Sequence, residues 1–288
     1  MSKTFYILIS KSLLALILLG PTILLSQKAS IRVQHINSDD GLSQVHVNTI
    51  YQDTRGYTWF GTKNGLNRFD GHEIIVYKND PDKANTISDN FIRTIVEDNQ
   101  QRLWIGTDAS GLNVFDLNTE TFKRISLLSG GDRQRQSKQV WDMSIDENNQ
   151  LWIATWEGIY KINLETTTLQ AIPISSQGDQ VRSIHAKKDG SVWFGSEQNG
   201  LFEFDNPSVF HHQLNEKDEK LRVYTICEED NHTLWLGTKG GLIKFNTETK
   251  TFKNIPLVVS REEIEITALT IDLQGTLWIG TIDNGLIS

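Results

Sequence analysis

Several short stretches carry residue types that could do chemistry, but each lacks a necessary partner. LSGGDRQRQ at 128–136 has the form of a signature used by ATP-driven transporters. ATP binding there also needs a GxxxxGK[ST] phosphate loop, which the sequence does not contain. The pair His211–His212 has no cysteine or carboxylate at metal-ligand spacing, which favours a solvated loop. No Ser-His-Asp or Cys-His arrangement can be identified, so we expect no catalytic residue, no metal and no cofactor.

The overall charge narrows the class of partner. The 288 residues carry a formal net charge of −8, and the sequence pI is about 5.4. Nucleic acid is bound through concentrated positive charge, so it is excluded as a partner. Cys227 is the only cysteine in the sequence, which rules out an intrachain disulfide.

The first 30 residues differ in character from the rest. Lys3 and Lys11 precede an apolar run, LLALILL at 13–19, and a Gly-Pro break comes after it. Basic residues before a short apolar run are typical of a secretory signal peptide. We therefore predict a signal peptide at 1–30, with an uncleaved signal anchor as the alternative, and export of residues 31–288.

Six of the eight tryptophans recur at intervals of 41 to 48 residues. They are Trp59, Trp104, Trp152, Trp193, Trp235 and Trp278. Regular intervals of this length are typical of a repeat architecture. Twelve positions before each tryptophan stands a β-branched residue, and six positions before it stands a residue that is usually acidic. The second residue after the tryptophan is usually Gly, the third carries a hydroxyl, and a further glycine lies in the turn that follows. Ala154 in place of Gly and Lys187 in place of the acid are the departures.

Each repeat predicts short strands joined by tight turns. Turn sequences such as DTRG and DENN favour reversal of the chain, and most repeats continue into a fourth strand. One four-stranded sheet cannot bury both of its faces, whereas radially stacked sheets cover one another. The sequence therefore predicts an all-β fold over 31–288, a β-propeller of four-stranded antiparallel blades with the recurring tryptophan packed between blades. Because the sixth repeat stops inside its third strand, we expect a ring truncated from seven blades; six blades closed by a strand at 31–37 is the alternative.

Ligand contacts are expected at positions that vary between repeats, because packing fixes the repeated ones. One such position lies eleven residues before each tryptophan, at the start of the first strand, and the other is the second turn. These positions lie at the same end of a blade, so both sets should line one face around the channel mouth. The candidate ligand-binding residues are Trp141, Trp156, Arg93, Arg182, Tyr224, Asn48, Lys63, Glu197 and Lys239.

Trp141 and Trp156 are the two tryptophans outside the repeat pattern, and both belong to the third repeat. Two aromatic side chains on one rim are typical of a platform for a flat or sugar-like ligand. Arg93 and Arg182, from the flanking repeats, could pair with a carboxylate or a sulfate. Two alternatives stay open: the two tryptophans pack on each other, or they pack on a later domain or a second protomer.

The stretch GLSQ…VNTIYQDTRGYTWFGTKNGLNRFDG at 41–71 resembles the two-component regulator propeller repeat. The linker KNDPDKANTISDN at 78–90 is similar to the spacer between the first and second blades of that family. The resemblance extends over about 31–288. It implies the periplasmic sensor part of a bacterial membrane receptor, of the hybrid histidine kinase or the propeller-linked diguanylate cyclase type.

The resemblance leads to a functional expectation. We expect an exported propeller, on the periplasmic side of the bacterial inner membrane, that binds a small molecule such as an oligosaccharide. Enzymatic output would belong to a kinase or cyclase domain outside this chain. A homodimer would form through the receptor. The membrane would be contacted only by the N-terminal segment or by segments outside this chain. A scaffold propeller for protein contacts is the alternative, and a propeller lyase or glycosidase with facing acids is a further one.

Overall fold

The described part of the chain is built from antiparallel sheets. The computed structural model describes residues 35–127, 139–174, 180–214, 221–257 and 264–288. Met1–His35 forms one unit and Ile36–Ser288 a second, and all of the sheets belong to the second unit. The expected signal peptide at 1–30 and the stretch 128–136 lie outside the described residues.

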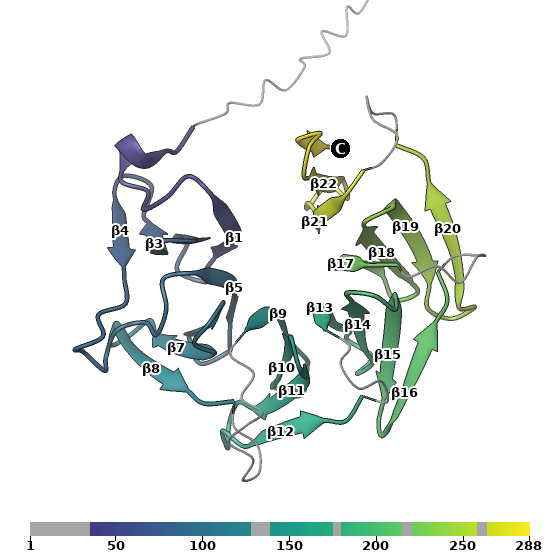
Figure 1. Cartoon of the computed structure of the whole chain (residues 1–288), viewed down its shortest axis with the longest axis horizontal. Helices are drawn as coiled ribbons and strands as arrows, with labels where there is room; N and C mark the ends of the chain where they lie inside the picture. Colours follow the sequence, from purple (N-terminus) through teal and green to yellow (C-terminus); the bar gives the residue numbers. More distant parts are fainter. Residues whose placement is uncertain (1–34, 128–138, 175–179, 215–220, 258–263) are drawn as a thin grey trace, which may run out of the picture. The chain divides into compact units, whose positions relative to one another are not determined.

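Six sheets succeed one another along the second unit, and each is a meander of consecutive strands. The first three blades consist of β1 (Val47–Gln52), β2 (Thr58–Thr62), β3 (Gly65–Phe69) and β4 (Ile74–Tyr77); β5 (Ile92–Glu97), β6 (Arg102–Thr107), β7 (Leu112–Asp116) and β8 (Thr121–Ile125); β9 (Val140–Ile145), β10 (Gln150–Thr155), β11 (Gly158–Asn163) and β12 (Leu169–Ile172). The last three consist of β13 (Val181–Ala186), β14 (Val192–Ser196), β15 (Leu201–Asp205) and β16 (Ser208–His212); β17 (Val223–Asp230), β18 (Thr233–Thr238), β19 (Gly241–Asn246) and β20 (Thr251–Ile255); β21 (Ile266–Ile271), β22 (Leu277–Thr281) and β23 (Leu286–Ile287). The blades are arranged around a ring with the first strand of each nearest the centre (Figure 1). The predicted all-β propeller is confirmed, and six blades are observed.

Two local expectations need correction. His211 and His212, expected in a solvated loop, lie on β16, where His212 Nε2 is 2.9 Å from Glu203 Oε2. The strand expected at 31–37 is not seen over residues 35–37, which have no regular structure and lead into a 3-10 helix, Ser38–Asp40. The remainder of that expected strand lies outside the described residues.

The recurring tryptophan packs between neighbouring blades, as predicted. Among the described residues, five apolar clusters each combine side chains from two consecutive blades. In the first of these seams, Trp59 of blade 1 packs with Ile92, Ile95 and Phe115 of blade 2. The tryptophan ring therefore contributes apolar area that neither blade could bury alone.

In blades 1, 2, 3 and 6 the acidic residue of the repeat accepts a hydrogen bond from the tryptophan of its own blade. Trp104 Nε1 donates to Asp98 Oδ2 at 2.7 Å, and the equivalent bond in blades 1, 3 and 6 is 2.8 Å long. The repeated hydroxyl instead donates to the carbonyl of the turn glycine, as Thr107 does to Gly111 at 2.8 Å. Both repeated polar residues thus have structural partners, which leaves the varying positions for recognition.

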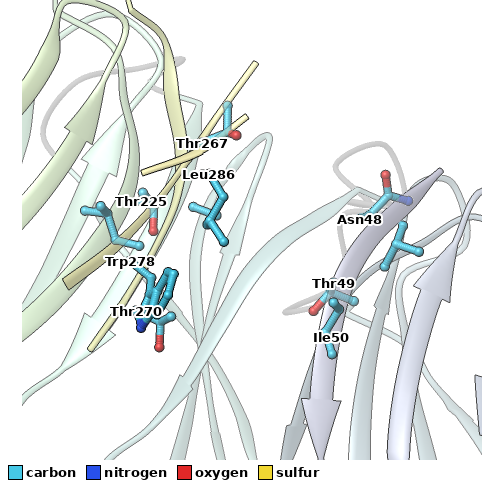
Figure 2. Close-up of a pocket in the computed structure, with 12 residues that line it drawn as sticks. Asn48, Thr49, Ile50, Thr225, Thr267, Thr270, Trp278 and Leu286 are labelled. Atoms are coloured by element: carbon cyan, nitrogen blue, oxygen red, sulfur yellow. The ribbon is translucent and has the colours of Figure 1, made fainter. Parts of the chain in front are cut away.

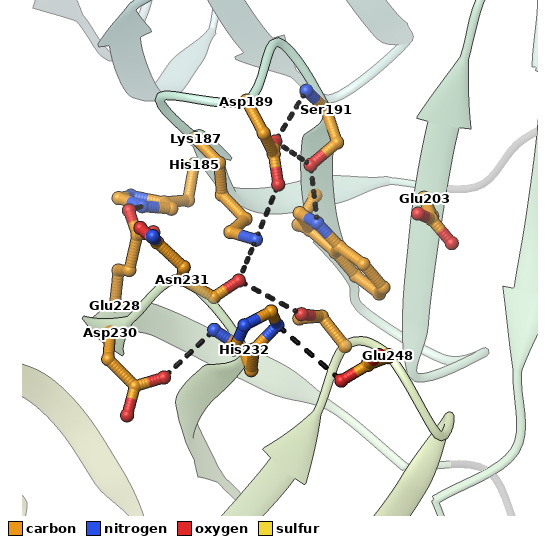
Figure 3. Close-up of polar contacts among 12 residues, drawn as sticks. His185, Lys187, Asp189, Ser191, Glu203, Glu228, Asp230, Asn231, His232 and Glu248 are labelled. Atoms are coloured by element: carbon orange, nitrogen blue, oxygen red, sulfur yellow. Dashed lines mark hydrogen bonds and ion pairs between the residues drawn. The ribbon is translucent and has the colours of Figure 1, made fainter.

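In blade 4, Lys187 replaces the acidic residue of the repeat and makes a different set of hydrogen bonds (Figure 3). Its buried ammonium donates to Asp189 Oδ2 at 2.8 Å and to the carbonyl of Asn231, in blade 5, at 2.7 Å. Burial pushes the pKa of Asp189 upward, but bonds from Lys187 and Ser191 outweigh this and lower the pKa to about 2. Ser191 Oγ accepts the indole N–H of Trp193 at 3.2 Å. Lysine in place of the acid therefore replaces the tryptophan–carboxylate hydrogen bond within one blade by a hydrogen bond between blades 4 and 5.

The glycine two positions after the tryptophan sits where two blades approach most closely. A Cβ on Gly106 would lie 2.5 Å from Val140 Cγ1, in the next blade, and 2.7 Å from Thr94 Cγ2. At Gly280, in blade 6, the nearest atom to such a Cβ is Ala268 Cβ of the same blade, at 3.1 Å. A Cβ at this glycine would therefore clash both with the following blade and with the first strand of its own sheet.

We predict that Gly106→Ala lowers the free energy of unfolding by about 2 kcal/mol, because overpacking a seam forces the two blades apart. Gly280→Ala is the matched control and should change it by less than about 0.5 kcal/mol. Urea unfolding of both variants, followed by circular dichroism, measures the difference. Equal losses in the two variants would contradict the proposed role of the following blade.

Blades 1 and 6 face a shared cavity of about 520 Å³ (Figure 2). Ile50 of β1 and Trp278 of β22 both line this cavity. Ile50 is 65% exposed, whereas its equivalent in blade 2, Ile95, is 4% exposed. This seam is therefore open, unlike the other five, and the seven-bladed ring stays a prediction.

Candidate functional site

The varying position of the first strand is a β-bulge. In all six first strands the register shifts by one residue against the second strand. The residues left unpaired are Asn48, Arg93, Trp141, Arg182, Tyr224 and Thr267. A bulge frees a residue from the ladder and re-aims its side chain, so the propeller presents one such residue per blade.

The bulges and the second turns share one face, as predicted. Val140, which precedes the bulge of blade 3, pairs with Thr155, which precedes the second turn of that blade. The same pairing joins Val181 to Ser196 in blade 4. We call the bulge residues and the second-turn residues together the rim.

Trp141 lies between two arginines of neighbouring blades. The Arg93 Cζ atom is 3.6 Å from the centre of the Trp141 ring, and the Arg182 Cζ atom is 3.7 Å from it. Each contact is a cation–π interaction. The Trp141 ring is therefore already in contact with two guanidiniums of the protein itself.

Trp156 stacks against Trp141 and keeps an exposed surface. The two ring centres are 6.1 Å apart with an interplanar angle of 30°. Trp156 is 40% exposed in the turn between β10 and β11. The geometry matches the local-packing alternative for Trp141, while Trp156 retains surface that a ligand could contact.

Carboxylates pair with both arginines. Asp108 Oδ1 accepts Arg93 Nε at 2.6 Å and Gln139 Nε2 at 2.7 Å. Burial pushes the pKa of Asp108 upward, but the bonds from Gln139 and Arg93 outweigh this and hold the pKa below its usual value. The carboxylate is therefore ionised and pairs with the Arg93 charge.

Glu197 bridges two further arginines. Its Oε2 atom pairs with Arg182, and its Oε1 atom pairs with Arg222 of blade 5. Arg222 also donates to the Tyr224 hydroxyl at 3.0 Å, which in turn donates to Glu265 Oε2 at 2.8 Å. The contacts thus run without interruption from Asp108 in blade 2 to Glu265 at the entry of blade 6.

The structure brings six of the nine predicted residues into this chain of contacts. These are Trp141, Trp156, Arg93, Arg182, Glu197 and Tyr224. The other three lie elsewhere on the rim. The Asn48 amide donates to the carbonyl of Ile92 at 2.8 Å, the Lys63 ammonium lies 5.6 Å from the Phe91 ring centre, and Lys239 is exposed.

Sequence reasoning missed Gln139, Arg222 and Glu265, and a signal for them exists. Each stands one residue before the repeated β-branched position that opens the first strand. This position also varies, and its carbonyl accepts the N–H of a second-turn residue, as Arg222 does from Lys239 at 3.1 Å. The position thirteen residues before each tryptophan therefore belongs to the rim.

Asp142, next to Trp141, is a half-buried acid that the repeat does not predict. Its carboxylate accepts the backbone N–H of Met143 at 2.8 Å and of Ile184, in blade 4, at 3.0 Å. Burial raises its pKa to about 6, against the opposing effect of those bonds and one from Thr94. Asp142 thus connects the innermost strands of three blades.

In the described ranges, no three His, Cys, Asp or Glu side chains are grouped as a metal site would require. No helix of the described part of the chain has the length and apolarity needed to cross a bilayer.

The first two blades match a known repeat. The family model described as two component regulator propeller matches residues 41–64 and 86–109. These two stretches are two-component regulator propeller repeats. A histidine kinase, P4 from Formosa agariphila, is 51% identical over 49 residues, which are 17% of this chain and 4% of that protein.

Solved propellers resemble the whole ring. One is the extracellular domain assigned to the hybrid two component system BT3049 from B. thetaiotaomicron, with a TM-score of 0.76 and 26% sequence identity to this chain. The matched region is 88% of this chain and 34% of the BT3049 domain. Virginiamycin B lyase from Staphylococcus aureus has a TM-score of 0.66 and 14% sequence identity to this chain, and the matched region is 82% of this chain and 78% of the lyase. At 14% identity the lyase shows the fold alone. The chain thus spans a small part of the kinase and about a third of the extracellular domain, and its repeats resemble those of sensor proteins.

Proposed function

We propose that this propeller is the exported ligand-sensing domain of a transmembrane receptor. The two-component regulator propeller repeats and the likeness to the BT3049 extracellular domain support a sensor role. The receptor would pass the signal to a kinase or cyclase output domain outside this chain. Dimerisation through the receptor and a location on the periplasmic side of the membrane belong to the same proposal.

The observation that carries ligand binding is the exposed Trp156 on the rim. A large aromatic side chain in an open turn adds nothing to the seams between blades, where the repeated tryptophans lie. Its orientation is fixed from below by Trp141, which two arginines hold. A rigid, partly exposed indole is well suited to stack on the apolar face of a sugar ring, so an oligosaccharide is the proposed ligand.

Replacing Trp156 with Ala is expected to weaken binding of such a ligand by about tenfold or more, because a stacked aromatic typically contributes more than about 1 kcal/mol. A thermal-shift screen of neutral and anionic oligosaccharides against the full chain would identify the ligand, and calorimetry would compare the variant. Phe210→Ala is the matched control, since Phe210 is 48% exposed on β16, away from the rim.

Two outcomes would count against the proposal. Unchanged affinity in Trp156→Ala would exclude the rim as the binding site. Absence of saturable stabilisation by any compound in the screen would favour the scaffold alternative, in which the propeller makes protein contacts only.

A further inference from the structure

The charges in the chain of contacts from Asp108 to Glu265 are balanced group by group. Arg93 faces Asp108, and Arg182 and Arg222 share Glu197. Glu265 accepts a hydrogen bond from Tyr224, which itself is bonded to Arg222. Three guanidiniums are thus matched by three carboxylates within one connected set of contacts.

These carboxylates occupy the places that an anionic ligand would need. The Glu197 side chain is 9% exposed and engages both arginines through its two oxygens. A sulfate or carboxylate that approached Arg182 would have to displace Glu197, which would then be left as a partly buried charge without its partners. The Arg93 guanidinium is in the same position, because Asp108 pairs with it and itself accepts a hydrogen bond from Gln139.

The surroundings of Trp156 also disfavour anions. The next residue in its turn is Glu157, an exposed carboxylate. A negatively charged ligand stacked on Trp156 would lie beside that charge and be repelled by it. A hydroxyl-rich, uncharged ligand meets no such penalty.

We infer that the rim recognises an uncharged polyhydroxylated ligand, and that Asp108 and Glu197 act as positioning residues that close its arginines to anions. The inference rests on the proposed ligand-sensing function and specifies the ligand class. It also reverses the expectation that Arg93 and Arg182 bind a carboxylate or sulfate directly.

The first experiment tests the closed arginines without any knowledge of the ligand. The full chain and its variants are titrated with sodium sulfate, against sodium chloride at matched ionic strength, and the thermal unfolding midpoint is followed. The natural chain should show no saturable stabilisation by sulfate beyond that of chloride. Glu197→Gln releases Arg182 and Arg222 together and should bind sulfate at least about tenfold more tightly than the natural chain.

Asp108→Asn provides an independent second variant, because it releases Arg93, which does not share the Glu197 carboxylate. Glu120→Gln is the matched control: it releases Arg68 from an ion pair between the outer parts of blades 1 and 2, away from the rim. Saturable sulfate binding by the natural chain would overturn the inference. A lack of response in both rim variants, or an equal response in the control, would overturn it as well.

The second experiment tests ligand class by calorimetry with a neutral oligosaccharide and its sulfated derivative. Binding of the neutral compound that is lost in Trp156→Ala supports the inference. Tighter binding of the sulfated compound would overturn the inference while leaving the sensor proposal in place. Binding of neither compound would count against carbohydrate sensing itself, whereas the sulfate titration would still decide whether the arginines are closed.

Discussion

Replacing Ile95 with Ala is expected to lower the free energy of unfolding by about 3 kcal/mol, whereas Ile50→Ala should change it by less than about 0.5 kcal/mol. The two residues occupy the same position in consecutive blades, nine residues before the repeated tryptophan. Ile95 packs in the seam beside Trp59 and is 4% exposed, so its loss leaves a cavity there. Ile50 faces the open side of the ring and has little burial to lose.

Urea unfolding of the full chain, followed by tryptophan fluorescence, compares the two variants directly. Because the substitution is identical in both and both sites lie on first strands, the change in strand propensity cancels, and the difference reports burial alone. Equal destabilisation by the two variants would show that Ile50 is covered in solution, either by blade 6 or by another sheet.

The open side also carries exposed apolar side chains. Ile50 of β1 is 65% exposed and Leu286 of β23 is 66% exposed, and both line the cavity between blades 1 and 6. At the other seams the equivalent surfaces are covered by the next blade. A surface of this kind is prone to association unless a further element covers it, so the predicted seventh blade has a physical rationale in these residues.

The sequence was sufficient for the blades because their signals are local. Trp104, Gly106 and the turn residues around them specify a hairpin that is read within about a dozen positions, and six copies determine the repeat. The shared face of the bulges and second turns could also be predicted, since strand direction alone places them together. The tryptophan–aspartate bond was not predicted, although the fixed interval between Asp98 and Trp104 is its sequence signal.

The arrangement of the rim could not be predicted, because it depends on contacts between blades. Arg93, Trp141 and Arg182 come from three different repeats, and only the rotation from blade to blade brings their side chains into one stack. Sequence reasoning identified the residues but paired the arginines with a ligand. The turn carboxylates Asp108 and Glu197, which are paired with them instead, come from a different part of each repeat.

Asp142 is expected to make the stability of the chain fall by about 2 kcal/mol between pH 4 and pH 7, relative to an Asp142→Asn variant. Burial raises the pKa of Asp142 from 3.8 to about 6, so the folded chain binds a proton over a range where the unfolded chain has released it. The free energy of unfolding therefore decreases as pH rises through this range, and the full cost is present above it. Asn cannot ionise, so this contribution disappears in the variant.

Urea unfolding at a series of pH values measures the difference between the natural chain and Asp142→Asn. The pH-independent effects of the amide, including its fit to the N–H groups of Met143 and Ile184, cancel when only the change with pH is compared. Asp189→Asn is the control of opposite sign: the pKa of Asp189 is lowered to about 2, so its contribution is lost only below about pH 4, and its difference curve should be flat from about pH 4.5 to 7. A flat curve for Asp142→Asn would refute the buried-acid account. Since Asp142 is adjacent to Trp141 and is bonded to the inner strand of blade 4, a confirmed titration would place an ionisation near neutral pH directly beneath the rim.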